Sequence, residues 1–374
     1  MPDLQPFKLE RYFARYEFNA RYLLSASDCE SLRLDELLAM ADGESRRLWD
    51  DLGLGYTESP GHPLLRAQIA KAYAGLNADD VLVMAPEEAI YIFMRTLLTP
   101  GDEVVAIAPA YQSLHEVARA IGCRVIPWSL ALTENGWEAD LALLRRLLTA
   151  RTRLLVINFP HNPTGCLISR PELDAILELA GQQGIYVFSD EMYRLLELDP
   201  AQRLPAVCTL YERGVSLAGM SKVYGLPGLR IGWLATNAPG LRDRWQGYKD
   251  YTTICSSAPS EILALMGLRA QEQLVGRSLE IIRTNLGLAS EFCARHPRLF
   301  RWLPPQAGSV AFPQWNGPGP VEEFCQEMVD RQGVMVVPGS QFDYPGQSFR
   351  MGLGRRNFAE ALAQVEAGLA NLGR

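Results

Sequence analysis

One lysine, Lys222, could carry covalent chemistry in this chain. Only four of the 36 basic residues are lysines, and Lys222 stands between a buried-looking strand, 214–219, and a glycine-rich turn, 225–228. A lysine amine can lose its proton and condense with an aldehyde to form an imine, whereas an arginine guanidinium stays charged and cannot. Most lysines are simply exposed charges. The strand end, the turn and Arg230 eight residues later favour a site for a phosphate-bearing aldehyde instead.

Three other polar segments follow expected strands. In chain order they are APAYQS (108–113), NFPHNPTG (158–165) and SDEMYR (189–194). Each also has an ordinary interpretation: Tyr111 could pack in the core, NPTG could be a turn, and Asp190 could cap a helix. Because ligands of parallel sheets gather at the carboxyl ends of the strands, we expect these segments and Lys222 to lie together.

The elements that must position these residues form an α/β pattern. Helical patterns such as 87–98 and 171–184 alternate with six short apolar runs, at 81–84, 103–108, 124–128, 153–158, 185–190 and 214–219. Such near-continuous apolar strands are typical of a mostly parallel sheet that is buried on both faces. We expect a long helical region over roughly 238–296. Beyond it we expect the strands FRWL, SVAFP, VMVVP and SFRMG and helices near 321–332 and 357–372.

The sequence therefore predicts a large α/β domain, with a mostly parallel sheet flanked by helices, and a smaller α/β domain. With 374 residues and 48% hydrophobic content, the chain can fill two cores. The expected limits are 46–285 for the large domain and 286–374 for the small one. Residues 1–45 are expected to pack on the small domain.

Composition argues against several classes of partner. A formal charge of −7 and a pI near 5.3, without a basic run flanked by aromatics, argue against nucleic acid. The first 24 residues mix charges and aromatics, so they resemble neither a signal peptide nor a membrane span, and we expect a cytoplasmic protein. The seven cysteines and four histidines are scattered, which predicts neither a disulfide framework nor a metal site.

Four motifs in the same chain order resemble one known family. The segment SKVYGLPGLRIGW is similar to the cofactor-lysine signature of the class I/II aminotransferases, the fold-type I enzymes that use pyridoxal 5'-phosphate. The other three segments match in order, and the resemblance covers most of the chain. It implies an aspartate-aminotransferase-like fold with a cofactor-binding large domain. It further implies a homodimer with shared active sites, and transfer of an amino group from an amino acid to a 2-oxo acid through a Schiff base on Lys222.

The resemblance also implies roles for the residues around the cofactor. Asp190 would pair with the pyridine nitrogen, and Tyr193 and Asn162 would bond to the phenolic oxygen of the ring. Tyr111 would stack on the ring face, and Arg230 would bind the phosphate. The catalytic residues implied are Lys222, Asp190 and Tyr193.

Other residues are implied at the substrate and at the partner subunit. Arg350, in SFRMGLG, matches the arginine that holds the substrate α-carboxylate, and Asn162 and Ser27 are expected near the substrate. Tyr56 resembles the tyrosine that reaches the phosphate of the neighbouring subunit. The segment 249–261 resembles one that meets the active site of the partner, through Tyr251, Thr253 and Ser256. Arg355 and Arg356 could recognise an acidic side chain, although a solvated pair is favoured.

The chain departs from the family where the phosphate is usually held. Many relatives open the helix after the first strand with glycine, alanine and a hydroxyl residue, but this chain has Ala85, Pro86 and Glu87. Gly219 replaces a hydroxyl residue three positions before the lysine. Two lost bonds of about 1.5 to 3 kcal/mol each would weaken cofactor binding by about two to four orders of magnitude. We therefore predict a rewired phosphate site, formed by Ser221, Arg230, Tyr56 of a second subunit and backbone N–H groups near Glu87 and Glu88.

Other activities remain compatible with the sequence. The main alternative is a pyridoxal-phosphate-dependent lyase or cyclising enzyme of amino-acid metabolism, because the same first step precedes elimination and ring closure. A non-catalytic ligand-binding module is disfavoured, since no helix-turn-helix segment precedes the domain. Nicotinamide binding is disfavoured too, because GLPGLRIG is not spaced as G-x-G-x-x-G.

Overall fold

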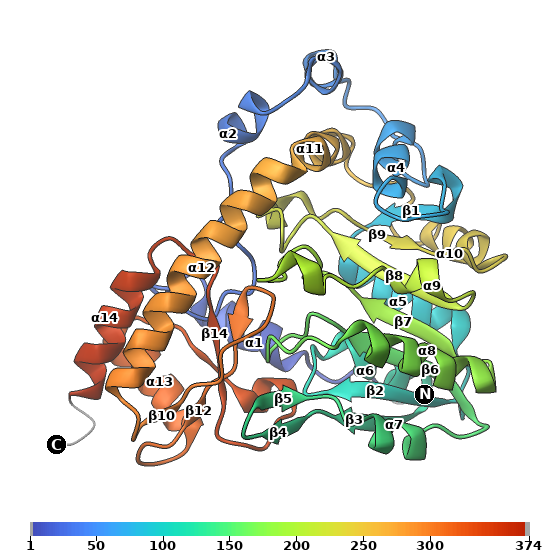
Figure 1. Cartoon of the computed structure of the whole chain (residues 1–374). Helices are drawn as coiled ribbons and strands as arrows, with labels where there is room; N and C mark the ends of the chain where they lie inside the picture. The colour runs from blue at the N-terminus through green and yellow to red at the C-terminus, as the bar shows by residue number, and fades with distance from the viewer. Residues whose placement is uncertain (1–2, 371–374) are drawn as a thin grey trace.

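A seven-stranded sheet forms the centre of the structure (Figure 1). The computed structural model describes residues 3–370. In spatial order the strands are β1 (Val81–Met84), β9 (Gly232–Ala235), β8 (Gly214–Gly219), β7 (Tyr186–Asp190), β6 (Thr152–Asn158), β2 (Glu103–Ala108) and β3 (Arg124–Ser129). Neighbouring strands run parallel, except that β9 is antiparallel to both β1 and β8. The predicted α/β fold with a mostly parallel sheet is confirmed.

The six expected strands are all present, and each lies within one residue of its predicted bounds. They are buried almost throughout, as the continuous apolar runs indicated, except that β3 is an edge strand with exposed positions. The sequence does not predict β9, because its four residues directly follow the glycine-rich turn and are too few to show a pattern.

Helices cover both faces of this sheet. On one face, α5 (Pro86–Leu97) packs against α6 (Ser113–Ile121) and α10 (Leu241–Lys249). On the other face lie α7 (Leu141–Leu147), α8 (Arg170–Gln183) and α9 (Val207–Leu210), of which α8 and α9 stand in front of the sheet in Figure 1. A β-hairpin of β4 (Ala131–Thr133) and β5 (Gly136–Glu138) extends from the β3 edge. The sheet is therefore a rigid base for the loops at its strand ends.

The expected helical region at 238–296 is three helices, not one. They are α10, α11 (Ala258–Arg269) and α12 (Gln271–Arg295). Ile254 has a left-handed backbone (φ 63°), and Ser257 caps α11 by accepting a hydrogen bond from the Ser260 N–H. A serine cap followed by Pro259 starts a new helix, which the apolar pattern alone does not show. The long helix α12 runs from α11, beside the large sheet, to the C-terminal elements (Figure 1).

The C-terminal elements form a second, smaller α/β unit. One sheet has the order β11 (Val310–Ala311), β14 (Phe349–Gly352), β13 (Val337–Pro338), and a strand pair joins β10 (Phe300–Arg301) to β12 (Gln314–Trp315). Its helices α13 (Val321–Gln332) and α14 (Phe358–Leu369) pack on each other, and α14 packs on α12. Trp315 stacks on Phe324 with ring centroids 4.2 Å apart. Both predicted helices are present, although the end of the expected 357–372 segment lies outside the described residues.

The N-terminal segment contacts both units. Helix α1 (Lys8–Tyr16) is held by a hydrogen bond from the Tyr12 hydroxyl to Val336 O (2.8 Å) on one side. On the other side, the Lys8 N–H donates to Gln112 Oε1 (2.9 Å). Helices α2 (Leu34–Ala39) and α3 (Gly43–Asp50) pack against α11 instead. The domain limits 1–45, 46–285 and 286–374 stay a prediction, and residues 1–2 and 371–374 lie outside the described part.

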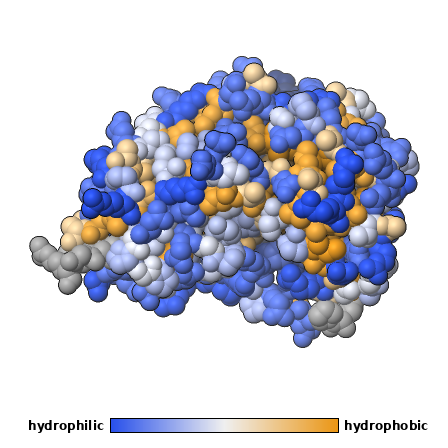
Figure 2. All heavy atoms as spheres, turned by 60° about the horizontal axis from the view of Figure 1, so that its bottom comes forward, coloured by the Kyte–Doolittle hydropathy of each residue, from blue (hydrophilic) through white to orange (hydrophobic). Residues whose placement is uncertain are grey.

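Exposed hydrophobic residues are unevenly distributed. On the face in Figure 2, hydrophobic areas are interrupted by hydrophilic residues. Four strongly exposed residues lie in two loops, 51–57 and 250–257: Leu54 (87%), Tyr56 (93%), Tyr251 (92%) and Ile254 (53%). The loops lie close together, because the Lys249 ammonium donates hydrogen bonds to Ser59 O (2.6 Å) and Ile254 O (3.0 Å).

Three observations on residues 3–370 complement the composition. Within this range no helix is both long and apolar enough to cross a membrane. The same residues contain no cluster of three or more histidine, cysteine or carboxylate side chains that could hold a metal ion. All seven cysteines are free thiols.

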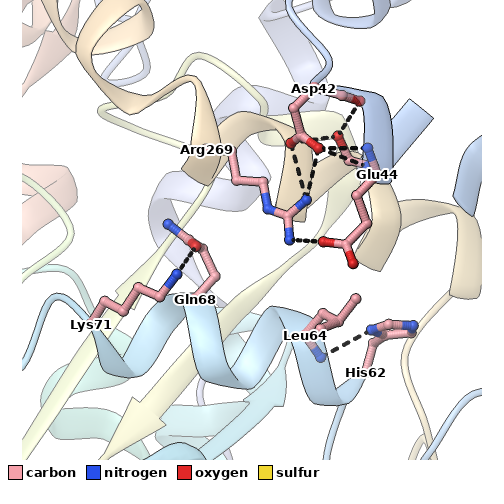
Figure 3. A network of polar contacts seen from close by, with 8 residues as sticks. Asp42, Glu44, His62, Leu64, Gln68, Lys71 and Arg269 are labelled. Atoms are coloured by element: carbon pink, nitrogen blue, oxygen red, sulfur yellow. Dashed lines mark hydrogen bonds and ion pairs between the residues drawn. The ribbon is translucent and has the colours of Figure 1, made fainter. Parts of the chain in front are cut away.

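An ion-pair network fixes α3 against α11 (Figure 3). Asp42 caps α3 by accepting from the N–H groups of Glu44 (2.9 Å) and Ser45 (3.0 Å). The Arg269 guanidinium donates to both Asp42 oxygens (3.0 Å) and to Glu44 Oε2 (2.6 Å). Desolvation acts to raise the pKa of Asp42, but the hydrogen bonds from Ser45, Arg269 and Glu44 lower it to about 2.

Replacing Asp42 by alanine is expected to lower the free energy of unfolding by about 1 kcal/mol, the usual loss for an N-cap. Because the folded pKa of Asp42 is below its unfolded value, this contribution is present above pH about 4 and is lost as the pH falls toward 2. Urea unfolding at pH 7 measures the effect. Asp51→Ala, at the exposed opposite end of α3, is the control, and an equal loss in both variants would contradict the capping role.

Candidate active site

A cavity of about 540 Å³ lies at the carboxyl ends of β6, β7 and β8, between the large sheet and the N-terminal segment. Nine of the twelve sequence-predicted site residues line it: Ser27, Glu87, Tyr111, Asn162, Asp190, Tyr193, Ser221, Lys222 and Arg230. They come from segments that are distant in sequence. The sheet brings most of them together because they lie in the loops that follow its strands or at the start of the next helix, whereas Ser27 comes from the N-terminal segment between α1 and α2.

The Lys222 amine points into the cavity and donates a hydrogen bond to Ser27 Oγ (2.8 Å). Residues 27–30 pack on the turn that carries it, since the Cys29 N–H donates to Lys222 O (3.3 Å). Gly225 allows this contact, because it has φ +65° and a Cβ there would lie 2.6 Å from Glu30 O. The lysine is thus held by a neutral hydroxyl group, and no carboxylate of residues 3–370 forms an ion pair with its amine.

Asp190 ends β7 at the floor of the cavity. Its Oδ1 accepts from the Met192 N–H (3.1 Å), and its carbonyl accepts from Asn158 Nδ2 (2.8 Å). Burial raises the pKa of Asp190 to about 7; the Met192 hydrogen bond and Lys222 oppose this rise and Glu87 adds to it. A cation placed against this carboxyl group would favour its ionised form.

Two further polar residues, Tyr193 and Asn162, line the cavity. The Tyr193 hydroxyl is buried and has no hydrogen-bond partner among the described residues. Asn162 is fixed through its N–H, which donates to Asn158 Oδ1 (2.9 Å), while its own Oδ1 accepts from Arg350 Nη1 (3.1 Å). Since a buried hydroxyl is costly to leave unpaired, Tyr193 indicates a missing polar ligand.

Arg350 lies behind this wall on β14 and is only 1% exposed. Its Nε donates to Ser25 O (3.1 Å), but Nη2 is buried without a partner. Within residues 3–370 no carboxylate pairs with this guanidinium, and burial lowers its pKa. A buried cation without a counter-ion is unfavourable, so the position fits an anionic group of a ligand.

Comparison with known proteins identifies this arrangement. The family model for aminotransferase class I and II matches residues 25–364. The chain belongs to this family. Capreomycidine synthase from Streptomyces vinaceus is 32% identical over 365 residues, which cover 97% of this chain and 91% of the relative.

Two solved structures cover nearly the whole chain. A pyridoxal-phosphate-dependent aminotransferase from Streptococcus suis matches with a TM-score of 0.91 and 28% identity, over 99% of this chain and 98% of that one. The pyridoxal-phosphate-dependent cyclase OrfR matches with a TM-score of 0.90 and 30% identity, over the same shares. The resemblance in the sequence is confirmed, and this aminotransferase uses pyridoxal phosphate.

The cavity residues fit that cofactor. Asp190 offers a buried carboxyl group for a ring nitrogen, Tyr193 an unpaired hydroxyl, and Lys222 an amine for an aldehyde. Arg230, with a left-handed backbone (φ 55°), and Ser221 line the same cavity as Pro86 and Glu87 of α5 and offer donors for a phosphate.

The structure explains why a hydroxyl is missing at position 219. A Cβ on Gly219 would lie 3.0 Å from Gly232 Cα and 3.1 Å from Ile231 O, so a side chain here would be in tight contact with β9 and would require a small shift of that backbone. Helix α5 begins with Pro86 and has no side-chain cap at Ala85. Tight packing thus disfavours a side chain at position 219, whereas nothing in the structure explains the absence of a hydroxyl residue at the start of α5.

Three predicted residues do not line the cavity. Arg350 lies behind it, as described. The Glu88 carboxylate accepts hydrogen bonds from Thr252 and from Thr253 (2.9 Å), so its side chain turns away from the cavity. Tyr56 is fully turned to solvent at 93% exposure.

Of the other residues considered from the sequence, some line the cavity and some do not. Tyr251 and Thr253 are exposed and Ser256 is partly exposed, all outside the cavity. The expectation of a solvated arginine pair is wrong for Arg355. This residue lines the cavity and forms two hydrogen bonds to Asp28 (3.0 and 2.8 Å), while Arg356 is exposed.

Sequence reasoning missed four charged or aromatic lining residues: Glu10, Phe13, Glu17 and Asp28. The Tyr111 hydroxyl, assigned only to ring stacking, donates to Glu10 Oε1 (2.9 Å). A signal was present, because residues 10, 13 and 17 share one face of a helix. Nothing in the sequence indicated that this face would meet the cavity.

Proposed function

We propose that this aminotransferase moves the amino group of an amino acid to a 2-oxo acid, with Lys222 as its covalent anchor and proton-transferring residue. One observation carries the proposal. The Lys222 amine, the buried Asp190 carboxyl and the unpaired Tyr193 hydroxyl face one cavity, and Arg350 stands behind it with an unpaired Nη2. A bound pyridoxal phosphate supplies an aldehyde for the substrate amine and a ring that withdraws electrons from the substrate α-carbon.

The residues of the chain do the remaining work. Arg350 binds the substrate α-carboxylate, and its hydrogen bond to Asn162 fixes the guanidinium plane. The α-carbon then lies near Lys222, whose Nζ accepts the α-proton while Ser27 Oγ keeps the amine in place. Asp190 stabilises a positive charge on the ring nitrogen, and Tyr111 covers a ring face.

The phosphate would be held by the rewired site. We infer that Ser221, Arg230 and the backbone N–H groups of Glu87 and Glu88 at the start of α5 provide the donors on this chain. Tyr56 of a second subunit would complete them. A cofactor affinity in the millimolar range for the folded dimer would show that these groups do not replace the lost donors.

A homodimer is part of this proposal. The exposed side chains Leu54, Tyr56, Tyr251 and Ile254 lie in two neighbouring loops, which supports burial against a second copy. We retain the expectation of a cytoplasmic location as part of the proposal.

The direct test of amino transfer traces the nitrogen atom of the amino donor into the product. Purified protein with pyridoxal phosphate is incubated with a panel of ¹⁵N-labelled amino acids and a 2-oxo acid. We expect the label in the amino acid formed from the 2-oxo acid, at one product per donor consumed. Labelled ammonia formed without any requirement for the 2-oxo acid would contradict transfer and indicate elimination.

Ring formation is a second candidate, favoured by a specific observation. Capreomycidine synthase and the cyclase OrfR both align with nearly the entire chain, at 32% and 30% identity. Removal of the α-proton by Lys222 could also be followed by loss of a β-substituent and closure of a ring. The same assay separates the two, because cyclisation retains the α-nitrogen in the product and needs no 2-oxo acid.

A further inference from the structure

One face of helix α1 forms part of the cavity wall. Glu10, Phe13 and Glu17 follow one another at intervals of three and four residues, and all three line the cavity. The helical hydrogen bond from the Glu17 N–H to Phe13 O (2.8 Å) keeps Glu17 on this face. The cavity therefore has two carboxylates on the wall contributed by the N-terminal segment.

These two carboxylates lack a positive partner. Among residues 3–370, no arginine, lysine or histidine forms an ion pair with Glu10 or Glu17; Glu10 accepts only from the neutral Tyr111 hydroxyl. The lining cation Arg355 is engaged with Asp28. Burial raises the pKa of Glu17, and the like charges of Asp28 and Glu10 add to the rise, whereas the positive charges of Arg355 and Lys222 oppose it. Glu10 and Glu17 can therefore still receive a direct ion pair from a cationic group of a ligand.

A cation without an ion pair among the described residues borders the same wall, because the guanidinium carbon of Arg350 lies 5.8 Å from the ring centroid of Phe13. Arg350 Nη2 is buried without a partner, behind the wall formed by Ser25 and Asn162. An occupant that satisfies both sides has a carboxylate at one end and a cation at the other, with an amine between them near Lys222.

We propose that the amino-acid substrate carries a cationic side chain, a guanidinium or an ammonium group, which Glu10 and Glu17 recognise. This inference rests on the proposed function, since it assumes that the α-carboxylate is held by Arg350. Phe13 lies between the two carboxylates on α1 and covers the methylene groups of such a side chain. An acidic side chain is repelled by Glu10 and Glu17, and a neutral one leaves both carboxylates partly desolvated without a counter-charge.

L-Arginine and L-citrulline test the charge directly. The two amino acids have nearly the same shape, but citrulline has a neutral urea group where arginine has a guanidinium. Dissociation constants are measured by calorimetry on the Lys222→Ala variant loaded with pyridoxal phosphate, and kcat/KM on the native enzyme. We expect arginine to bind about 30-fold more tightly than citrulline, a preference of the size that partly buried charge pairs give.

Substitutions of Glu10 and Glu17 test whether α1 causes the preference for arginine over citrulline. Glu17→Gln is expected to reduce the preference for arginine over citrulline, measured as the ratio of their dissociation constants, about tenfold. The double variant Glu10→Gln, Glu17→Gln is expected to abolish this preference. Glu17→Asp, which keeps the charge, restores part of the ratio. Glu280→Gln, on the exposed surface of α12, is the matched control and leaves the ratio unchanged. Melting temperatures equal to that of the native protein show that the variants fold.

Two outcomes overturn the inference: equal binding of arginine and citrulline by the native protein, or an arginine preference that persists in the double variant. Failure of the proposed function has a different signature. In that case no donor transfers its nitrogen to a 2-oxo acid, while the calorimetric arginine preference and its loss in Glu17→Gln remain measurable.

Discussion

Replacing Lys222 by alanine is expected to lower the rate of amino transfer by about 10⁴-fold or more, because the variant loses both the anchoring amine and the base that accepts the α-proton. Lys222→Arg should be equally inactive, since a guanidinium stays protonated and cannot condense with an aldehyde. Initial rates with the best donor of the ¹⁵N panel measure the effect. The native protein reduced with borohydride should carry the cofactor mass on the peptide that contains Lys222, and Lys222→Ala should show no such adduct.

Lys71 provides the matched control for this lysine. It is exposed on the surface, where its ammonium bonds to Gln68 Oε1 (3.0 Å; Figure 3), and it does not line the cavity. Lys71→Ala should retain the native rate and the adduct. Mass spectrometry that places the adduct on any residue other than 222, or a Lys222→Ala rate above about one tenth of the native rate, would be incompatible with the proposed role.

Sequence could predict the part of the site that sits at strand ends. Asn162, Asp190 and Lys222 each follow a buried strand, and parallel strands bring their carboxyl ends to one edge. Position in the fold therefore follows from the apolar pattern, and the residue types follow from the chemistry. The role of Arg350 came only from the resemblance, because a strand arginine is usually a surface charge.

The remainder of the site depends on contacts between distant segments. The Tyr111 to Glu10 bond joins residues 101 positions apart, and the Lys222 to Ser27 bond joins residues 195 apart. No local pattern specifies such pairs, so the acidic face of α1 could not be placed at the cavity. The same limit explains Arg355, whose partner Asp28 lies 327 residues earlier.

Short-range packing also overrides motif expectations. A side chain at Gly219 would be in tight contact with Gly232 of β9, a strand that the sequence did not reveal. The break between α10 and α11 arises from the left-handed Ile254 and the Ser257 cap. Gly219 and the break at 254–257 both lie within about four residues of positions assigned to the site or to the subunit contact. Local sequence rules are most often broken near functional sites.

Arg350→Met is expected to raise KM for amino-acid donors by about 10² to 10³-fold, because a buried charge-assisted pair with the α-carboxylate contributes about 3 to 4 kcal/mol. Cofactor attachment to Lys222 should persist, since Arg350 lies outside the cavity lining. The decisive measurement compares an amino acid with its decarboxylated amine. The native enzyme should strongly prefer the amino acid, and Arg350→Met should lose most of this preference. Arg356→Met, at an exposed position six residues later, should keep it.

The melting temperature of Arg350→Met distinguishes binding of the substrate carboxylate by Arg350 from a purely structural role. Arg350 is 1% exposed, donates to Ser25 O and Asn162 Oδ1, leaves Nη2 unpaired, and has no counter-ion among residues 3–370. Its guanidinium carbon also lies 5.0 Å from the Phe342 ring centroid and 5.8 Å from that of Phe13, and these cation–π contacts compensate the charge only in part. Replacing an uncompensated buried charge by an apolar side chain of similar length is often neutral or stabilising. We therefore expect Arg350→Met to melt at or above the native temperature while it loses substrate affinity. A variant that loses both together, without a change in the preference for the carboxylate, would show that Arg350 supports only the packing between β14 and the N-terminal segment. Unfavourable burial of this guanidinium in the free protein is the physical reason to assign it to a ligand, because the energy is recovered when an anion binds.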